Sequence, residues 1–383
     1  MMKKIHQIIT QAYVSNSSCL LLSLIISYKI YFKQNVVCMD KILKSNEKYL
    51  IVKSFDKNYK AIVYKYDLRR KPKIIKEFKK INSLRVENNF YNDHLVPVSN
   101  LSKDNKWGFK NLYKYKMPFI EGNSYSLVLR DKKIDYSIKA ELTSFLYKKF
   151  SKVVLKKKIE KKYIQYSWEN QAKILINNLY KVDYLSNFLE SSFYINGNYI
   201  DAPIKRLLDF FRKKNKMFFY EKNIHGNFHG ENIIVTDLKR FNKFKIIDPD
   251  CSLKKVDPSF SLARFLYTFI HDSVEYKKYN IYLNSKDFEI RNFSYKYIWD
   301  KNTVDSYELL DSIIIDLIEH FDTDYDANRL FKSFIHCLLI GAIANDNGIK
   351  FTNYKSNKIK INCNSYFILF KVFEYINKLE LKY

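Results

Sequence analysis

The spacing of apolar residues changes along the chain and separates a β-rich part from a helical part. Between residues 41 and 121, short apolar runs alternate with polar turns, which is typical of strands. The runs that predict strands are 49–52, 61–66, 95–98 and 112–117. One helix interrupts them. It opens at Pro72, a favoured first-turn position, and carries an apolar stripe of Ile74, Phe78 and Ile81.

From residue 122 to residue 383, apolar positions mostly recur every three or four residues, as in amphipathic helices. The segments with this pattern are 134–150, 168–189, 204–211, 307–321, 330–339 and 366–376. The sequence therefore predicts an α+β fold with two lobes. A small antiparallel β-lobe with one helix spans residues 41–121, and a larger, mostly helical lobe spans residues 122–383. Residues 1–40 are treated as an N-terminal extension.

One stretch of the helical part reads differently. Residues 225–250 run HGNFHGENIIVTDLKRFNKFKIIDPD, which predicts a loop, a strand, a turn and a second strand. Asn232 closes the loop and Asp248 closes the hairpin. Amide and carboxylate oxygens are ligands of hard cations such as Mg2+. The two ends of this hairpin are therefore predicted to hold one divalent cation.

The bulk composition limits the kind of protein this is. The chain has 383 residues, 47% of them hydrophobic and 17% aromatic, which suits a globular protein with a large core. Its net charge is +27, but most of its 67 basic residues are lysines, and they are spread along the whole sequence. Nucleic-acid readers rely on arginine and on clustered basic patches. The charge therefore does not favour nucleic acid as a partner.

The cysteines and the N-terminal residues point to a reducing compartment. The five cysteines (19, 38, 251, 337 and 363) form no C-x-x-C pair, so neither a zinc site nor a disulfide framework is expected. Cys337 lies in an apolar run and is expected to fill the core. The apolar stretch at 19–26 is too short to span a membrane. We expect a cytoplasmic protein.

The loop also carries a family resemblance. His225, Gly226 and His229, with Asn232 and then Asp248, resemble the H-G-D-x-H-x-x-N and I-D motifs of the aminoglycoside phosphotransferase and choline kinase family. That family has a protein-kinase-like fold with two lobes. The resemblance implies ATP and Mg2+ as cofactors, and a nucleotide and a small-molecule acceptor as partners. It implies that Asn232 and Asp248 bind the metal.

The resemblance also implies a nucleotide site in the β-rich lobe. Lys65 ends the second predicted strand and Glu77 lies in the following helix, so we expect this pair to position the phosphates, with Lys60 as the alternative lysine. Residues 41–107 contain no glycine, so a Gly-rich phosphate loop is absent. The segment from Met117 to Gly122 resembles the linker that contacts adenine through its backbone. Met117 and Phe119 are the candidates there.

Two positions depart from the family pattern. Asn227 stands where the family has its catalytic aspartate, and Ser261 stands where a second acid braces the loop. An asparagine can orient a hydroxyl group, but it cannot accept its proton near neutral pH. Candidate catalytic residues are therefore Asn227, His225 and His229, with Glu231 and Asp250 as other possible bases. His225 can also serve as a structural brace, and Ser261 as a helix cap.

Three functions remain open from the sequence. The first is an ATP-dependent phosphotransferase that acts on a hydroxyl of a sugar, aminocyclitol or amino alcohol. The second is a nucleotide-binding pseudokinase with a scaffold or regulatory role, which the Asn227 and Ser261 departures favour. The third is a basic binding module unrelated to kinases. The sequence does not identify the acceptor, because a fold does not fix a substrate.

Overall fold

The structure is a computed structural model, and it describes the larger part of the chain. The described residues are 41–45, 49–56, 58–67, 69, 72–103, 112–155, 163–181, 189–190, 192–195, 198–213, 216–220, 224–250, 257–271, 281–284, 292–296, 301–344, 350–352, 358–362 and 364–382. The predicted N-terminal extension, residues 1–40, lies outside this set. Among the described residues, no helix is long and apolar enough to cross a bilayer.

The chain forms two compact units. Unit 1 comprises the described residues up to Gly122 together with Ile234–Asp237 and Lys243–Ser252, and unit 2 comprises the rest. The sequence placed its border between residues 121 and 122 and assigned the whole hairpin to the helical part. In the structure, most of the hairpin groups instead with the β-rich unit.

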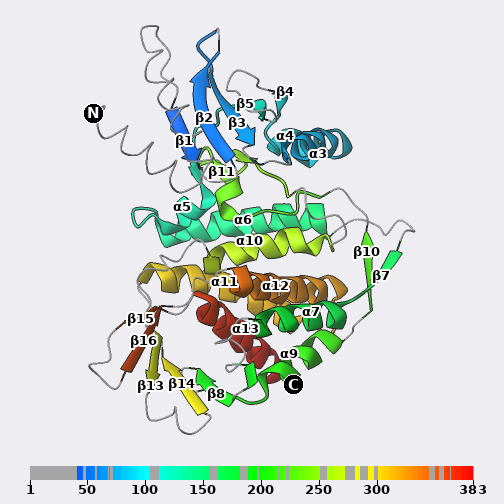
Figure 1. Cartoon of the computed structure of the whole chain (residues 1–383), viewed down its shortest axis with the longest axis vertical. Coiled ribbons are helices and arrows are strands. Elements are labelled where there is room, and N and C mark those ends of the chain that lie inside the picture. Colours follow the sequence, from blue (N-terminus) through cyan, green and yellow to red (C-terminus); the bar gives the residue numbers. More distant parts are fainter. Residues whose placement is uncertain are drawn as a thin grey trace. The chain divides into compact units, whose positions relative to one another are not determined.

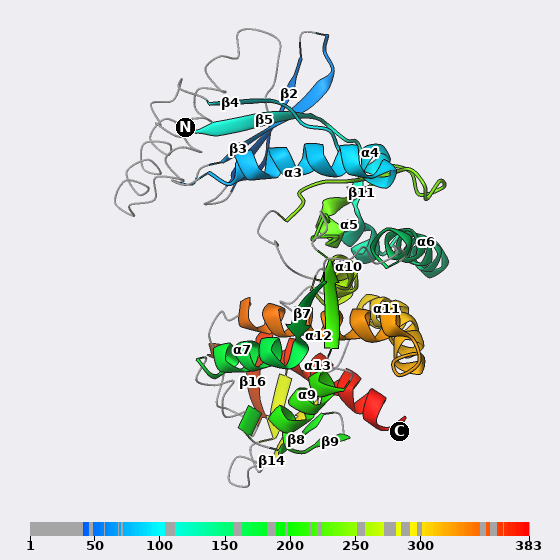
Figure 2. The ribbon, with the colours of Figure 1, turned by 90° about the vertical axis from the view of Figure 1, so that its right-hand side faces the viewer.

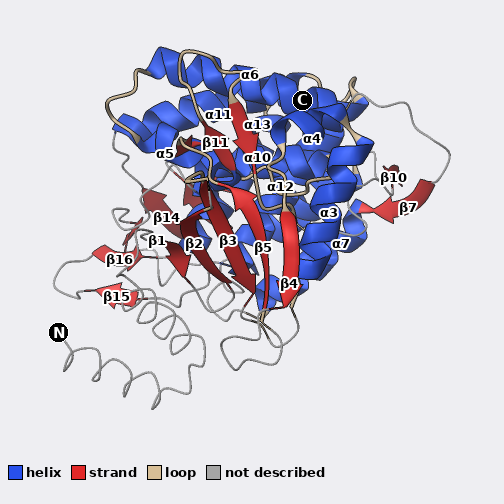
Figure 3. Ribbon diagram, turned by 90° about the horizontal axis from the view of Figure 1, so that it is seen from above, coloured by secondary structure: helices blue, strands red, loops and turns tan. Residues whose placement is uncertain are grey.

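Unit 1 is built on a five-stranded antiparallel sheet in the order β1-β2-β3-β5-β4 (Figure 3). Its strands are β1 (Lys41–Ser45), β2 (Tyr49–Phe55), β3 (Ala61–Asp67), β4 (Ser99–Lys103) and β5 (Tyr113–Pro118). The predicted strand at 95–98 was wrong. Leu95 makes one isolated bridge, and the strand itself begins at Ser99.

Two helices follow β3: α3 (Ile74–Glu87) and α4 (Asn89–His94). Figure 2 shows α3 running beside the sheet of unit 1. Of the predicted stripe, Ile74 and Ile81 are almost fully buried, whereas Phe78 is only half-buried. Leu84, which the prediction did not include, completes the buried face. Glu77 lies on the same stripe and is only 2% exposed, so a charged group sits where an apolar one would be expected.

The hairpin strands β11 (Ile233–Val235) and β12 (Phe244–Ile246) are neighbours, and β12 is fastened to the helical side of unit 1. The Val96 N–H donates to the Ile246 carbonyl at 3.0 Å. The His94 ring stacks on Phe244, with a centroid separation of 4.1 Å. These contacts hold β12, and Asp248 lies two residues after the strand ends at Ile246.

Unit 2 is mostly helical. Figure 1 labels its long helices α6, α10, α11, α12 and α13. The buried side chains of these helices are mainly aromatic and aliphatic. α12 packs against both α10 and α13. Cys337 is fully buried in this core, as predicted. The helices are α5 (Tyr125–Arg130), α6 (Tyr136–Val154), α7 (Trp168–Tyr180), α9 (Pro203–Arg212), the 3-10 turn η1 (Gly230–Asn232), α10 (Ser259–His271), α11 (Lys301–Glu319), α12 (Tyr325–Ala344) and α13 (Asn364–Glu380).

Unit 2 also contains strands that the sequence did not predict. A six-stranded sheet has the order β15-β16-β13-β14-β8-β9, and β10 pairs with β7. Their bounds are β6 (Asn123–Ser124), β7 (Tyr163–Ser167), β8 (Ser192–Ile195), β9 (Asn198–Ile200), β10 (Lys216–Tyr220), β13 (Ile281–Asn284), β14 (Asn292–Lys296), β15 (Lys350–Thr352) and β16 (Lys358–Asn362). The α+β class predicted from the sequence is confirmed, with a small antiparallel sheet in one unit and a mostly helical second unit.

A buried histidine in α12 has an unusual environment. The His336 side chain is 7% exposed and meets the rings of Trp168 and Phe260 edge-on, at centroid distances of 5.7 and 5.6 Å. Neither of its ring nitrogens has a hydrogen-bond partner in the part of the chain that the structure describes. Burial, reinforced by the nearby Arg264, lowers the pKa of His336 to about 4.

This environment predicts acid sensitivity. Below pH 6.5, the ordinary histidine pKa, His336 binds a proton in the unfolded chain but stays neutral in the folded chain until the pH approaches 4. Stability is therefore complete above pH 6.5 and falls by on the order of 3 kcal/mol as the pH drops towards 4. His336→Phe should remove this part of the pH dependence. The measurement is urea unfolding of both proteins from pH 7.5 to 4.5. If the free energy of unfolding falls equally with pH in both proteins, the prediction is wrong.

Candidate functional site

In unit 1, the sheet register places a lysine at the centre of an aromatic face. Lys65 on β3 lies opposite Ile51 of β2 and opposite Tyr115 of β5. Residues that pair across antiparallel strands point to the same face. Tyr49 shares that face, and the Lys65 ammonium lies 4.4 Å from the centre of its ring. Lys65 is 3% exposed, which is rare for a lysine unless it is paired.

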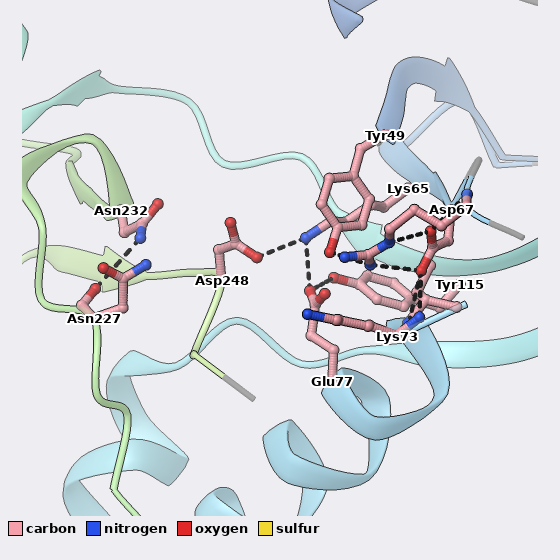
Figure 4. A network of polar contacts seen from close by, with 11 residues as sticks. Tyr49, Lys65, Asp67, Lys73, Glu77, Tyr115, Asn227, Asn232 and Asp248 are labelled. Atoms are coloured by element: carbon pink, nitrogen blue, oxygen red, sulfur yellow. Dashed lines mark hydrogen bonds and ion pairs between the residues drawn. The ribbon is translucent and has the colours of Figure 1, made fainter. Parts of the chain in front are cut away.

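The first partner of Lys65 is the glutamate predicted from the sequence. The Lys65 Nζ donates to Glu77 Oε1 at 2.8 Å, so the predicted contact between β3 and α3 is present. The hydroxyl of Tyr115 donates to the same Glu77 oxygen (Figure 4). Lys60, the alternative lysine, is exposed, and its backbone closes the β2–β3 turn on Asp56.

The second partner is Asp248, which follows β12. The Lys65 Nζ donates to Asp248 Oδ1 at 2.6 Å, and the Asp248 side chain is 46% exposed. Its backbone has φ +57°, a left-handed conformation that costs free energy in most residues but that aspartate tolerates better than most. Strain of this kind clusters at functional sites, where the surrounding structure enforces it. Here the fastening of β12 to unit 1 supplies that constraint.

The electrostatics of this group are those of one cation shared by two acids. Burial opposes the charge on Lys65, but Asp248 and Glu77 outweigh it and raise the pKa of Lys65 above its ordinary value. Burial also raises the pKa of Glu77, and the Lys65 ammonium opposes that rise only in part. Both directions are consistent, because a single ammonium cannot compensate two carboxylates fully. Burial raises the pKa of Tyr49 to about 12, so its hydroxyl stays protonated.

In unit 2, the loop at residues 225–232 is held by its own backbone and by α10. The Gly226 N–H donates to Ser261 Oγ at 3.0 Å, and the Gly230 N–H donates to Thr268 Oγ1 at 2.8 Å. A side chain at Gly230 would collide with Thr268. Ser261 is therefore a brace of the loop and does not cap α10, because the carboxylate of Asp257 accepts the Ser259 N–H at that end.

The predicted residues of this loop have distinct surroundings. His225 is fully buried and stacks on Phe228 at a centroid distance of 5.0 Å, which suits the structural role considered for it. Its Nδ1 accepts the Asn227 N–H at 3.3 Å. The Asn232 side-chain amide donates to the Asn227 carbonyl at 3.3 Å, so its oxygen is the atom that would coordinate a cation (Figure 4). His229 and Asn227 are both half-buried.

The adenine-contact candidates Met117 and Phe119 lie at the end of β5. The Phe119 N–H donates to the Ala61 carbonyl at 3.1 Å, and Met117 pairs with Val63, so the backbone groups of both residues face β3. Successive residues of a strand direct their backbone groups to opposite edges. The Pro118 carbonyl and, by the same alternation, the Ile120 N–H therefore point away from β3. Gly122 has φ +152°, and a Cβ there would lie 2.4 Å from the Val235 carbonyl oxygen.

Some participants could not be found from the sequence. Tyr115 and Tyr49 contact Glu77 and Lys65, but a tyrosine in a strand gives no signal until its register is known. Among the described residues, no group of three or more His, Cys, Asp or Glu side chains is arranged around a common metal position.

No family model matches the sequence, and no curated protein matches it. Among solved structures, the chain is similar to a putative aminoglycoside phosphotransferase from Ralstonia eutropha, with 10% identity, a TM-score of 0.45, and 92% of this chain and 98% of that one covered. The amicoumacin kinase hAmiN in complex with AMP-PNP, Ca2+ and Ami gives 9% identity, a TM-score of 0.43, and 88% coverage of each chain. The GDP complex of aminoglycoside 2'-phosphotransferase-IIIa gives 9% identity, a TM-score of 0.42, and coverage of 94% and 97%. The roles discussed below rest on contacts within the present chain.

Proposed function

We propose that this protein binds ATP with a divalent cation and transfers the γ-phosphoryl group to a hydroxyl of a small molecule such as a sugar, aminocyclitol or amino alcohol. The observation that carries the proposal is the buried Lys65 between Glu77 and Asp248. Phosphoryl transfer depends mainly on positioning and charge neutralisation, and a strand lysine paired with a helix glutamate is how kinases hold the α- and β-phosphates.

The ion group of Lys65, Glu77 and Asp248 is not explained by a contribution to stability alone. A buried ion pair often contributes less than well-packed apolar residues of the same size. Here Lys65 is also paired with Asp248, whose backbone is in a left-handed conformation. The Asp248 side chain is 46% exposed and therefore accessible to a divalent cation, which takes oxygen ligands. These features support a ligand-binding role for unit 1.

Each residue then has a chemical task. Lys65 would neutralise phosphate charge, and Glu77 would keep its ammonium in place. Asp248 would hold Mg2+, which neutralises charge on the transferred group, and Asn232 remains a predicted second ligand. Asn227 would orient the acceptor hydroxyl by a hydrogen bond without accepting its proton.

A pseudokinase is the second candidate, and Asn227 favours it. General-base assistance is typically worth about 10²–10⁴-fold in rate, so a site without a carboxylate at this position would be slow or inactive. Ser261 still braces the loop through a neutral hydroxyl. The loop architecture is thus kept, whereas the proton acceptor is missing.

Binding is tested by thermal unfolding with ATP, with Mg2+, and with both, in parallel with ADP formation across a panel of acceptors. We expect the largest rise in melting temperature with ATP and Mg2+ together. A ligand at about 100 times its Kd stabilises the folded state by about 2.7 kcal/mol. A rise with turnover supports the phosphotransferase, and a rise without turnover supports the pseudokinase. No rise with ATP and Mg2+ refutes both.

Asp248→Asn is the matched variant. Asparagine also tolerates a left-handed backbone, and the substitution leaves Lys65 with one carboxylate, so the fold should be preserved. We expect this variant to lose the additional stabilisation by Mg2+ while ATP alone still has its effect. An unchanged Mg2+ effect would remove Asp248 from the proposed metal site.

A further inference from the structure

Asp67, the carboxylate at the end of β3, accepts more hydrogen bonds than the Lys65 ammonium donates. Asp67 ends the strand two residues after Lys65, on the same face, and is 1% exposed. Its Oδ2 accepts the backbone N–H of Lys73 at 2.7 Å and that of Ile74 at 2.9 Å. Its Oδ1 accepts the Arg69 N–H at 3.1 Å and the Arg69 Nε at 2.8 Å. Figure 4 shows this cluster.

These bonds cap helix α3 from a distance. Lys73 occupies the N-cap position but provides no side-chain cap, although the first N–H groups of a helix have no partner within it. Asp67 satisfies two of those groups, and a negative charge there also suits the positive end of the helix dipole. Burial would raise the pKa of Asp67, but the hydrogen bonds from Arg69 and Ile74 lower it below the ordinary value. The cap is therefore charged at neutral pH.

Arg69 ties the same carboxylate to the aromatic face of the sheet. Its Nη2 lies 2.7 Å from Asp67 Oδ2 and also donates to the Tyr49 hydroxyl. The guanidinium lies 4.4 Å from the centre of the Tyr49 ring, the same ring that the Lys65 ammonium contacts. Arg69, Tyr49 and Lys65 thus form one connected set of contacts with Asp67.

The spacing links this cap to the ion pair. Glu77 lies one helical turn after Lys73, and the Glu77 N–H donates to the Lys73 carbonyl at 3.1 Å. Two residues of β3 therefore hold two successive turns of α3, since Asp67 fixes the first turn and Lys65 contacts the second. If the first turn came loose, Glu77 could withdraw. Lys65 would then pair with Asp248 alone, and this pairing would compete with the cation for that carboxylate.

We propose that Asp67, supported by Arg69, is a positioning residue of the nucleotide site. It fixes the start of α3 so that Glu77 stays paired with Lys65 without help from a ligand or a partner. This inference rests on the proposed function, because the consequence that matters is the affinity for ATP and Mg2+. Within the described residues, the contacts that set the position of Glu77 come from unit 1 itself.

The test is a double-mutant cycle between Asp67 and Glu77. In the otherwise unchanged protein, Asp67→Ala should weaken the binding of ATP with Mg2+ by about tenfold. In the Glu77→Gln background, the same substitution should weaken binding by less than about twofold, because no Glu77 charge is left to position. Equal losses in both backgrounds, or no loss in either, would overturn the proposal. General destabilisation would give equal losses.

Two further variants test whether the effect is specific to Asp67 and replace Asp67→Ala if it does not fold. Asp324→Ala removes a comparable carboxylate cap from α12 in unit 2, where Asp324 Oδ1 accepts the Asp326 N–H at 2.7 Å. It should lower stability and leave nucleotide affinity unchanged, and an equal loss of affinity would count against a specific role for Asp67. If Asp67→Ala does not fold, Arg69→Ala replaces it. That substitution keeps the bonds to Lys73 and Ile74, so a smaller loss with the same dependence on Glu77 is expected.

Hydrogen exchange separates this inference from the proposed function. The amides of Lys76 and Glu77 bond to the Lys73 carbonyl, and they should exchange faster in Asp67→Ala while the amides of α12 keep their protection. This result needs no nucleotide. If the unchanged protein binds no ATP, the proposed function is wrong. Accelerated exchange in Asp67→Ala would still establish that Asp67 holds the first turn of α3. Unchanged exchange at these two amides would show that Asp67 does not hold the first turn of α3, and the inference would be wrong.

Discussion

Replacing Lys65 with methionine should destabilise unit 1 by roughly 3 kcal/mol, one of the largest effects expected of any single substitution in this chain. Methionine matches the length and volume of the lysine stem, so the loss comes from charge and not from a cavity. Glu77 is 2% exposed and would be left without its cation. Removing one partner of a buried pair typically costs 3–5 kcal/mol, and Asp248 adds little because water can reach it.

A second substitution should restore part of the stability that Lys65→Met loses. Glu77→Gln added to Lys65→Met removes the orphaned charge and keeps a side-chain oxygen for the Tyr115 hydroxyl. We expect the double variant to regain at least half of the lost stability. Recovery would identify the penalty as that of an unpaired buried carboxylate.

The measurement is urea unfolding, read together with hydrogen exchange in β3 and α3 so that unit 1 is reported separately. Lys60→Met is the matched control, because Lys60 lies five residues earlier and is exposed. It should change stability by less than about 0.5 kcal/mol. If the two lysine variants were equally stable, or if the double variant were no better than Lys65→Met, the description of this ion group would be wrong.

The Lys65–Glu77 contact was predicted from the resemblance to kinases, and the local spacing is consistent with it. Alternation in β3 puts Lys65 on the face with Val63, and the helical spacing puts Glu77 on the stripe with Ile74 and Ile81. Asp248 could be singled out because a hairpin ends there. Six helices of unit 2 overlap the segments predicted from the same spacing, but α5 and α10 lie outside those segments. The predicted segment 168–189 contains α7, which ends at Tyr180, and part of it lies outside the described residues.

Other features could not be predicted, because they depend on contacts between distant segments. The capping of α3 by Asp67 requires the chain to turn back over six residues, and no capping motif lies at the helix itself. The direction of the Met117 and Phe119 backbone groups could not be predicted either, since it depends on the strand register. The sheet of unit 2 was missed because its short strands pair across long separations, as when β14 pairs with β8.

Asn227 is the position where one atom should decide between the two proposed functions. The Asn227 N–H donates to His225 Nδ1, and its carbonyl accepts from the Asn232 amide, so neighbouring groups hold the backbone of this residue. Asparagine and aspartate have the same shape. Asn227→Asp therefore adds a proton acceptor to the loop and leaves both backbone bonds in place.

We expect Asn227→Asp to raise the turnover of ATP by about 10²–10⁴-fold, the usual worth of a general base, with little change in the KM for ATP. The phosphoryl acceptor need not be known, because hydrolysis by water can be followed as ADP formation in parallel with the acceptor panel. Asn227→Ala is the control, since it removes the amide without adding a base and should not raise turnover. If Asn227→Asp still gains thermal stability from ATP and Mg2+ but turns over no faster, the missing carboxylate at residue 227 is not what limits turnover. The pseudokinase would then be the better description of this protein.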